Sequence, residues 1–257
     1  RCLNFLETAD AGQLVLDGET FDLAHAGRAD IARLRKKTAF VFQSYNLFRN
    51  KTALQNVTEG LIIVRKMPKE QADAVGMKML EKVGLADRAD YYPRQLSGGQ
   101  KRRVAVAGVM AMKPRILVLD EPAAGLDPEG RDDILSEVKE YHKKTGTTVL
   151  LVSHSMEDIA KYANRVLVMS NKKIAMYDTV EKVFARAPEL LELGLSVPQV
   201  TKIFLKLREM GVDVPADVYT IPYAVKTILA AKARRDAGES LVLPRDAENG
   251  KGGVSGC

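Results

Sequence analysis

The stretch that most constrains the fold of this chain runs from residue 94 to residue 103 and contains Leu-Ser-Gly-Gly-Gln. Ser97 is a good helix N-cap, because its side-chain oxygen can accept a hydrogen bond from the first turn. Gly98 and Gly99 let backbone N–H groups come close to a ligand. The sequence therefore predicts a helix from Gln100 to Met112, whose N–H groups and dipole are suited to binding phosphate.

A second informative stretch follows about twenty residues later and reads Ile116-Leu-Val-Leu-Asp-Glu-Pro122. Its four apolar residues are too few to cross a membrane. They predict a buried parallel strand that brings Asp120 and Glu121 to the carboxyl edge of a sheet. Open α/β sheets bind their ligands at that edge.

Together these two stretches resemble the signature motif and the Walker B strand of ATP-binding-cassette (ABC) ATPases. The resemblance implies an α/β fold with a P-loop NTPase (RecA-like) core, a helical subdomain, a partial antiparallel β subdomain and a C-terminal helical extension. It also implies that the protein binds and hydrolyses ATP with Mg²⁺, as the subunit that energises transport across a membrane.

The composition fits a protein of this kind. At 257 residues the chain can bury a substantial core, and 46% apolar with 28% charged residues is ordinary. The two cysteines match no metal-binding spacing, which favours a reduced cytosolic protein. The net charge of +6 is spread without a basic block, so we do not expect nucleic acid as a partner.

The phosphate-binding loop of the family, G-x-x-x-x-G-K-[ST], does not occur in the sequence. The nearest match, Gly125 and Gly130, is followed by Arg131 and has no lysine. Residues 1–7 look like the end of the helix that follows this loop in ABC ATPases. We therefore expect the chain to be a fragment that cannot hydrolyse ATP by itself.

Periodic patterns predict the organisation of the chain. Strands are expected at 12–18, 38–42 and 147–152, and helices at 52–64 and 69–83. A closing hairpin is expected around Ser170 and Asn171. We expect these domains: an ABC ATPase domain over 1–194, with a helical subdomain nested at about 52–112; a C-terminal helical extension over 195–235; and a disordered tail over 236–257.

The resemblance assigns roles at the strand ends. Asp120 would hold Mg²⁺ and Glu121 would act as general base toward the attacking water. Gln43, which follows the strand at 38–42, resembles the Q-loop glutamine and would touch Mg²⁺ or that water. Taken alone, Gln43 would more readily be interpreted as a polar loop residue. His154 resembles the switch histidine that contacts the γ-phosphate.

The resemblance also implies a site divided between two subunits. Ser97, Gly98, Gly99 and Gln100 would bind the γ-phosphate of ATP held by the other subunit, and Asp127 of the D-loop would cross the interface. The expected partners are a second ABC ATPase subunit, in a head-to-tail homo- or heterodimer, and integral membrane transport subunits. The protein would then lie at the cytoplasmic face of the cell membrane as a peripheral subunit.

The two halves of the chain resemble different ABC importers. Residues 1–95 resemble ATPases of polar amino-acid uptake. From about residue 100 the chain resembles ATPases of energy-coupling-factor (ECF) importers, which take up vitamins or transition-metal ions. A sequence joined from two genes and a natural hybrid subfamily both explain this difference.

We expect an ECF-type ATPase, because the second half is longer and includes the extension. The alternatives are a polar amino-acid importer ATPase, a soluble ABC ATPase of DNA repair or translation, and a module that binds without catalysis. The transported substrate is not readable from this sequence, because the membrane and binding subunits select it.

Overall fold

The computed structural model describes residues 2–42 and 45–241, which form two compact units divided between His154 and Ser155. Gln43 and residues 242–257 of the expected tail lie outside the described residues. The expected domain boundary after residue 194 stays a prediction.

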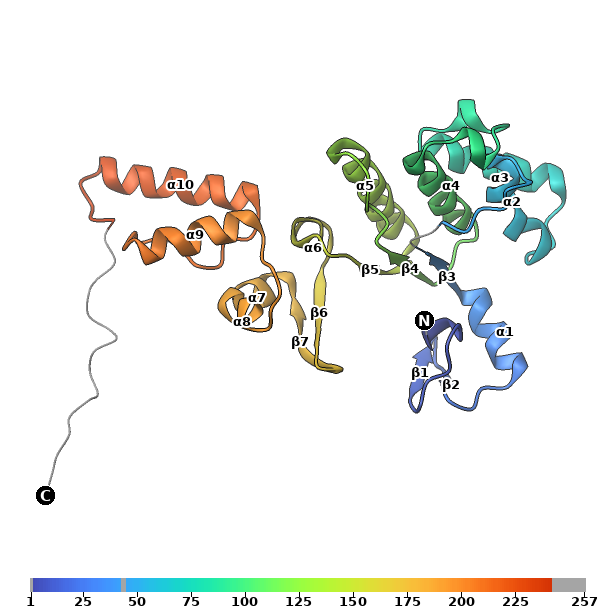
Figure 1. The fold of residues 1–257 in the computed structure, drawn as a ribbon, viewed down its shortest axis with the longest axis horizontal. Coiled ribbons are helices and arrows are strands. Elements are labelled where there is room, and N and C mark those ends of the chain that lie inside the picture. Colours follow the sequence, from blue (N-terminus) through green and yellow to red (C-terminus); the bar gives the residue numbers. More distant parts are fainter. Residues whose placement is uncertain (1, 43–44, 242–257) are drawn as a thin grey trace, which may run out of the picture. The chain divides into compact units, whose positions relative to one another are not determined.

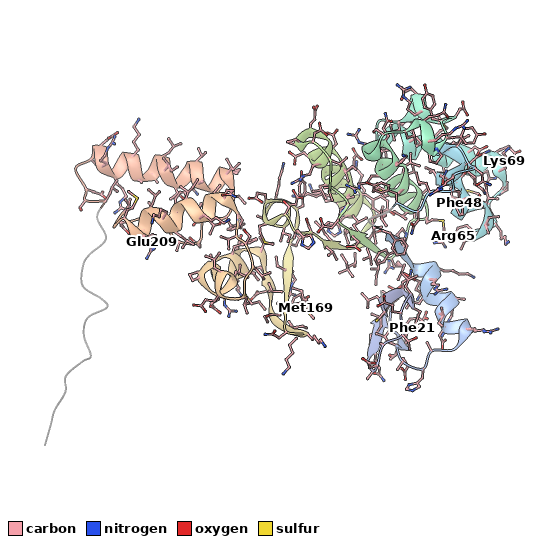
Figure 2. The ribbon with its side chains drawn as sticks, viewed as in Figure 1. Phe21, Phe48, Arg65, Lys69, Met169 and Glu209 are labelled. Atoms are coloured by element: carbon pink, nitrogen blue, oxygen red, sulfur yellow. The ribbon has the colours of Figure 1, made fainter. Side chains whose placement is uncertain are left out.

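The first unit opens with an antiparallel hairpin of β1 (Gln13–Leu16) and β2 (Glu19–Asp22). Its two-residue turn is Asp17-Gly18, with φ of 53° and 78°. Positive φ at both positions gives the backbone twist that tight hairpins prefer, and Asp-Gly adopts it readily. The strand expected at 12–18 is therefore confirmed, in a shorter form. Figure 2 labels Phe21 on this hairpin, where its side chain is buried.

A three-stranded parallel sheet forms the centre of the first unit, in the order β3-β4-β5. Its strands are β3 (Thr38–Val41), β4 (Ile116–Asp120) and β5 (Thr148–Val152). The middle strand, β4, has neighbours on both sides, and its Leu117 and Leu119 are fully buried. Asp120 pairs in register with Val152, so the segments after β4 and β5 leave the same edge side by side. This arrangement confirms the strand and the edge expected from the apolar run.

Helices cover this sheet and form a separate cluster beside it (Figure 1). Helices α2 (Ala53–Ile63), α3 (Lys69–Lys82) and α4 (Gly98–Ala111) share one apolar core. Helix α5 (Pro128–Thr145) follows β4 and ends at Gly146, whose φ of 68° suits glycine. The remaining short elements of the unit are α1 (Arg28–Lys37), η1 (Cys2–Asn4), η2 (Ala86–Arg88) and η3 (Pro93–Gln95).

The second unit begins with α6 (Met156–Tyr162) and an antiparallel hairpin of β6 (Arg165–Ser170) and β7 (Lys173–Thr179). The residues at the turn are Asn171 and Lys172, both with positive φ, and not the Ser170-Asn171 pair that the sequence suggested. The expected turn was wrong by one residue because Ser170 still pairs with Lys173 in the ladder.

In the described part of the second unit, four further helices follow: α7 (Val180–Phe184), α8 (Ala187–Glu192), α9 (Gln199–Glu209) and α10 (Ile221–Asp236). Phe204 of α9 is 1% exposed and packs with Val214, Val218 and Ala224. The apolar face of α9 is thus covered by α10 and the segment that leads into it. Among residues 2–42 and 45–241, no helix is long and apolar enough to cross a bilayer.

Candidate nucleotide site

The carboxyl edge of the parallel sheet holds the two acidic residues that the sequence placed there. Asp120 is the last residue of β4, and the N–H of Glu121 donates to the carbonyl oxygen of Val152 at 2.9 Å. Glu121 has a φ of 50°, in the left-handed region that non-glycine residues seldom occupy. Such conformations persist only where the surroundings enforce them, and they are frequent at functional sites. Here the backbone bond to β5 fixes Glu121 directly past the end of the strand.

The carboxylate of Glu121 faces His154 from the neighbouring strand end. Its Oε1 lies 3.6 Å from Nε2 of His154, a distance longer than a hydrogen bond. This Oε1 is buried, and among the described residues it accepts no hydrogen bond. The Glu121 side chain is only 13% exposed, whereas that of His154 is 95% exposed. A buried carboxylate oxygen without a partner is costly, so it is well suited to accept a proton or a hydrogen bond from a ligand.

The first turn of α4 has the cap that the sequence predicted. The N–H of Gln100 donates to Oγ of Ser97 at 3.2 Å, and the N–H of Ser97 donates to Oε1 of Gln100 at 2.9 Å. This reciprocal pair is a capping box. The helix begins at Gly98, two residues earlier than expected, because the cap overcomes the poor helix propensity of two glycines. The Gln100 N–H is occupied, so the N–H groups without an intrahelical acceptor are those of Gly98 and Gly99.

The two glycines of this turn have different surroundings. A Cβ at Gly98 would meet no atom within 4 Å, so the space where a side chain would stand is open. A Cβ at Gly99 would lie 2.7 Å from Cδ2 of Leu126, which belongs to the loop after β4. That loop therefore packs directly on the start of α4.

Asp127 occupies the N-cap position of α5, but its side chain makes no capping hydrogen bond. It is exposed and lies over Gly130, where a Cβ would be 2.7 Å from Oδ1 of Asp127 and 3.2 Å from Nη2 of Arg103. The absence of a side chain at Gly130 thus leaves room for a carboxylate and a guanidinium from two elements.

Sequence reasoning did not single out Arg102, which is 3% exposed within α4. Arg102 and Arg103 are adjacent in the sequence, and the pattern of residues around them does not indicate which of the two is buried. The guanidinium of Arg102 donates to the carbonyl oxygen of Ala124 and to the hydroxyl of Tyr45. Arg102 therefore joins α4 to two loops.

The described residues can be tested for their fit to Mg²⁺. They contain no group of three or more His, Cys, Asp or Glu side chains arranged to hold a metal. Mg²⁺ in nucleotide sites commonly takes only one or two carboxylates, together with phosphate oxygens and waters. Asp120, partly exposed at the strand end beside the unpartnered Oε1 of Glu121, fits such a role.

A cavity of the first unit lies at the other edge of the sheet. It has a volume of about 390 Å³ and is lined by six basic residues, including Lys37 just before β3 and Arg115 just before β4. The amino ends of parallel strands lie opposite the ligand-binding edge. This cavity is therefore separate from the acidic site.

Comparison with known proteins agrees with this architecture. The family model described as ABC transporter matches residues 1–124. The energy-coupling factor transporter ATP-binding protein EcfA2 of Caldanaerobacter subterraneus subsp. tengcongensis is 41% identical over 230 residues, covering 88% of this chain and 79% of that protein. The L-cystine import ATP-binding protein TcyN of Bacillus subtilis is 44% identical over 184 residues, covering 72% of this chain and 71% of that protein.

Two solved structures extend the comparison to the fold. The structure of cbiO1 from Clostridium perfringens, part of the ABC transporter complex cbiONQ, has a TM-score of 0.65 at 30% identity. The match covers 81% of this chain and 78% of the cbiO1 chain. The ATP-binding cassette MJ0796, in a dimeric post-hydrolysis state with ADP and Pi, has a TM-score of 0.63 at 27% identity. The match covers 69% of this chain and 77% of the MJ0796 chain.

The fold and the strand-end carboxylates define a nucleotide-binding ATPase cassette with the P-loop NTPase architecture. The chain belongs to the ATP-binding proteins of ABC transporters.

Proposed function

We propose that this chain belongs to the ATP-binding and ATP-hydrolysing component of an ECF-type import system that takes up a vitamin or a transition-metal ion, and that hydrolysis also needs a phosphate-binding loop, which the sequence does not contain. The observation that carries the catalytic part is the unpartnered, buried Oε1 of Glu121 directly past the end of β4. The ECF part is supported by relatives named as ECF ATP-binding proteins, whose similarity extends over 88% of the chain.

Glu121 acts as the general base in this proposal. Its Oε1 has no competing hydrogen bond among the described residues, so it can accept the proton of a water aimed at the γ-phosphate. Its fixed backbone suits catalysis of phosphoryl transfer, which depends mainly on positioning and electrostatics. His154 is exposed beside it and can donate a hydrogen bond to a phosphate oxygen.

Asp120 would hold Mg²⁺, and the ion would supply positive charge against the developing charge of the phosphates. Gln43 would complement this role by touching Mg²⁺ or the attacking water. That assignment comes from the resemblance of its sequence context alone.

The first turn of α4 binds the γ-phosphate of an ATP molecule held by a second subunit. The Oγ of Ser97 accepts from the Gln100 N–H and keeps its own proton to donate. The N–H groups of Gly98 and Gly99 add to the positive end of the helix dipole. Asp127 is exposed at the start of α5 and reaches across the interface. The related cassette MJ0796 forms a dimer, which supports a head-to-tail pair here.

The membrane partners are integral transport subunits, so the protein works as a peripheral subunit at the cytoplasmic face of the cell membrane. ATP closes the ATPase dimer and hydrolysis releases it. The related cbiO1 is part of the complex cbiONQ, which supports an assembly with other subunits.

The 257-residue chain by itself binds ATP weakly and does not hydrolyse it. The motif that supplies most ground-state phosphate contacts, G-x-x-x-x-G-K-[ST], does not occur in the sequence. Measuring ATP affinity and turnover of the purified chain tests this part. Tight binding with Mg²⁺-dependent hydrolysis would contradict it.

A polar amino-acid importer is the second candidate, because TcyN is 44% identical over 184 residues. Co-purification separates the two. A chain extended upstream of Arg1 by a phosphate-binding loop is co-expressed either with an ECF transmembrane subunit or with an amino-acid permease. We expect retention by the ECF subunit. Retention by the permease alone would show that the second candidate is right.

A further inference from the structure

Arg102 is a buried cation with an unusual set of partners. The Nη1 of its guanidinium donates to the carbonyl oxygen of Ala124, and the Nη2 donates to the Tyr45 hydroxyl at 2.9 Å. The Cζ of Arg102 lies 4.7 Å from the centre of the Tyr45 ring. Among the described residues, no carboxylate forms an ion pair with it. A buried charge is costly unless hydrogen bonds compensate it, so these contacts determine whether Arg102 is tolerated.

Both partners of Arg102 lie in irregular loops whose conformations need support. Tyr45 and Asn46 have φ of 63° and 48°, two consecutive non-glycine residues in the left-handed region. Ala124 precedes Gly125, whose φ is 72°. The residues of these two loops are in neither a strand nor a helix. A rigid helix that contacts both loops, as α4 does through Arg102, can therefore fix them relative to each other.

The loop after β4 contacts α4 at a second point. Leu126 packs on Gly99 where a side chain would not fit, and Arg102 binds Ala124 further along the helix. The position of residues 123–127 is therefore set by α4. Arg102 also bonds to Tyr45, so the loop containing Tyr45 is tied to the same helix.

We propose that Arg102 is a positioning residue that couples the loop containing Tyr45 to the loop of residues 123–127. The two donors that carry this coupling sit on one planar, rigid guanidinium. A shift of the Tyr45 hydroxyl therefore rotates the guanidinium and moves its Nη1 relative to the carbonyl oxygen of Ala124. The proposal rests on the proposed function, in which Asp127, at the end of the second loop, crosses the ATPase interface.

Lysine cannot reproduce this arrangement, because its ammonium is a single point of charge on a flexible stem. Arg102→Lys keeps the charge but loses the fixed pair of donors. Tyr45→Phe keeps the ring and removes only the hydroxyl acceptor. The second variant avoids the risk that a changed buried charge prevents folding.

A matched control is a tyrosine of α5 whose hydroxyl also bonds to α4. The Tyr141 hydroxyl donates to the carbonyl oxygen of Met110 at 3.2 Å, and Tyr141 is 5% exposed. Tyr141→Phe also removes one hydroxyl hydrogen bond to α4, but at the other end of the helix. A general loss of stability should therefore affect both tyrosine variants, whereas the coupling should be lost only in Tyr45→Phe.

Amide hydrogen exchange in the 257-residue chain tests the proposal directly. The reporters are the N–H groups of Ala124 and Leu126, which donate to Glu121 and Ala123 within the loop. We expect Tyr45→Phe and Arg102→Lys to speed their exchange by about two- to tenfold, the effect of one hydrogen bond, while Tyr141→Phe does not. Unchanged exchange in Tyr45→Phe, or an equal change in Tyr141→Phe, would overturn the coupling.

The measurement needs neither nucleotide nor a membrane partner. Its failure would therefore remove the role of Arg102 without bearing on transport. Failure of the proposed function would instead be seen in the co-purification experiment.

Discussion

The Oε1 of Glu121 lies 3.6 Å from Nε2 of His154, and the two residues follow neighbouring parallel strands at the same edge of the sheet. They are separated by about thirty residues of sequence, most of them in α5. The register that pairs Asp120 with Val152 brings them together, so the pair is a product of the sheet and not of local sequence.

His154→Ala should reduce ATP turnover in a chain extended by a phosphate-binding loop. Loss of one preorganised donor to a reacting phosphate typically costs about 10²–10³-fold in rate. Stability should hardly change, because the His154 side chain is 95% exposed. Steady-state ATPase assays and thermal unfolding measure the two effects.

The matched control is His25→Ala, since His25 is 84% exposed on the β1–β2 side of the same unit. It should leave turnover unchanged. Equal effects of the two histidine variants would argue against a role for His154 at the phosphate.

Comparing one serine cap with one threonine cap distinguishes an effect on helix stability from an effect on phosphate binding. Ser97→Ala and Thr52→Ala each remove the hydroxyl of a capping box, at the starts of α4 and α2. Each should lower the free energy of unfolding by about 1 kcal/mol. Only Ser97→Ala should also weaken ATP-driven dimerisation, as followed by light scattering of the extended chain. A similar loss of dimerisation in both variants would mean that Ser97 contributes stability alone.

We expect the ion pair of Asp17 to make part of the free energy of unfolding of the first unit depend on pH. The hydrogen bond from the Arg115 guanidinium, with help from Lys37, holds the pKa of the Asp17 carboxyl below its usual value of 3.8. A lowered folded-state pKa gives stability that is present above the unfolded pKa and is lost as the pH falls through the folded one. Asp17→Asn should thus be less stable than the parent at pH 7, and the difference should shrink below about pH 4.

Urea unfolding at several pH values measures this difference. Asparagine also accepts the left-handed conformation of the hairpin turn, so the substitution changes the charge and not the backbone. A difference that persists at pH 2 would show that the contribution of Asp17 is not its charge.

The elements with strong local signals could be predicted from the sequence. The alternation around residues 12–18 and the apolar run at 116–119 gave β1 and β4, and the stripes at 52–64 and 69–83 gave α2 and α3 within one or two residues. These patterns arise because one face of each element is buried, and the spacing of apolar residues along the sequence shows which face that is. The short helices α7 and α8 were not predicted, since five or six residues contain too few turns to show a period.

The features that depend on tertiary contacts could not be predicted. The burial of Arg102, in contrast to the partial exposure of Arg103, follows from where Tyr45 and Ala124 lie, which the local pattern does not record. The left-handed backbone of Glu121 likewise follows from its bond to β5. The sequence did indicate Asp120, Glu121 and His154 as candidates, because Asp120 ends β4, Glu121 directly follows it, and His154 lies two residues past the end of β5.

The most direct test of the account is Glu121→Gln in the chain extended by a phosphate-binding loop. The amide keeps the size of the side chain but cannot accept a proton, so turnover should fall by about 10²–10⁴-fold while ATP still binds. ATP should then hold the protein as a stable dimer, visible by size-exclusion chromatography with light scattering. A monomer in the presence of ATP, or turnover within a few-fold of the parent, would contradict the role of Glu121 as the general base of a site shared by two subunits.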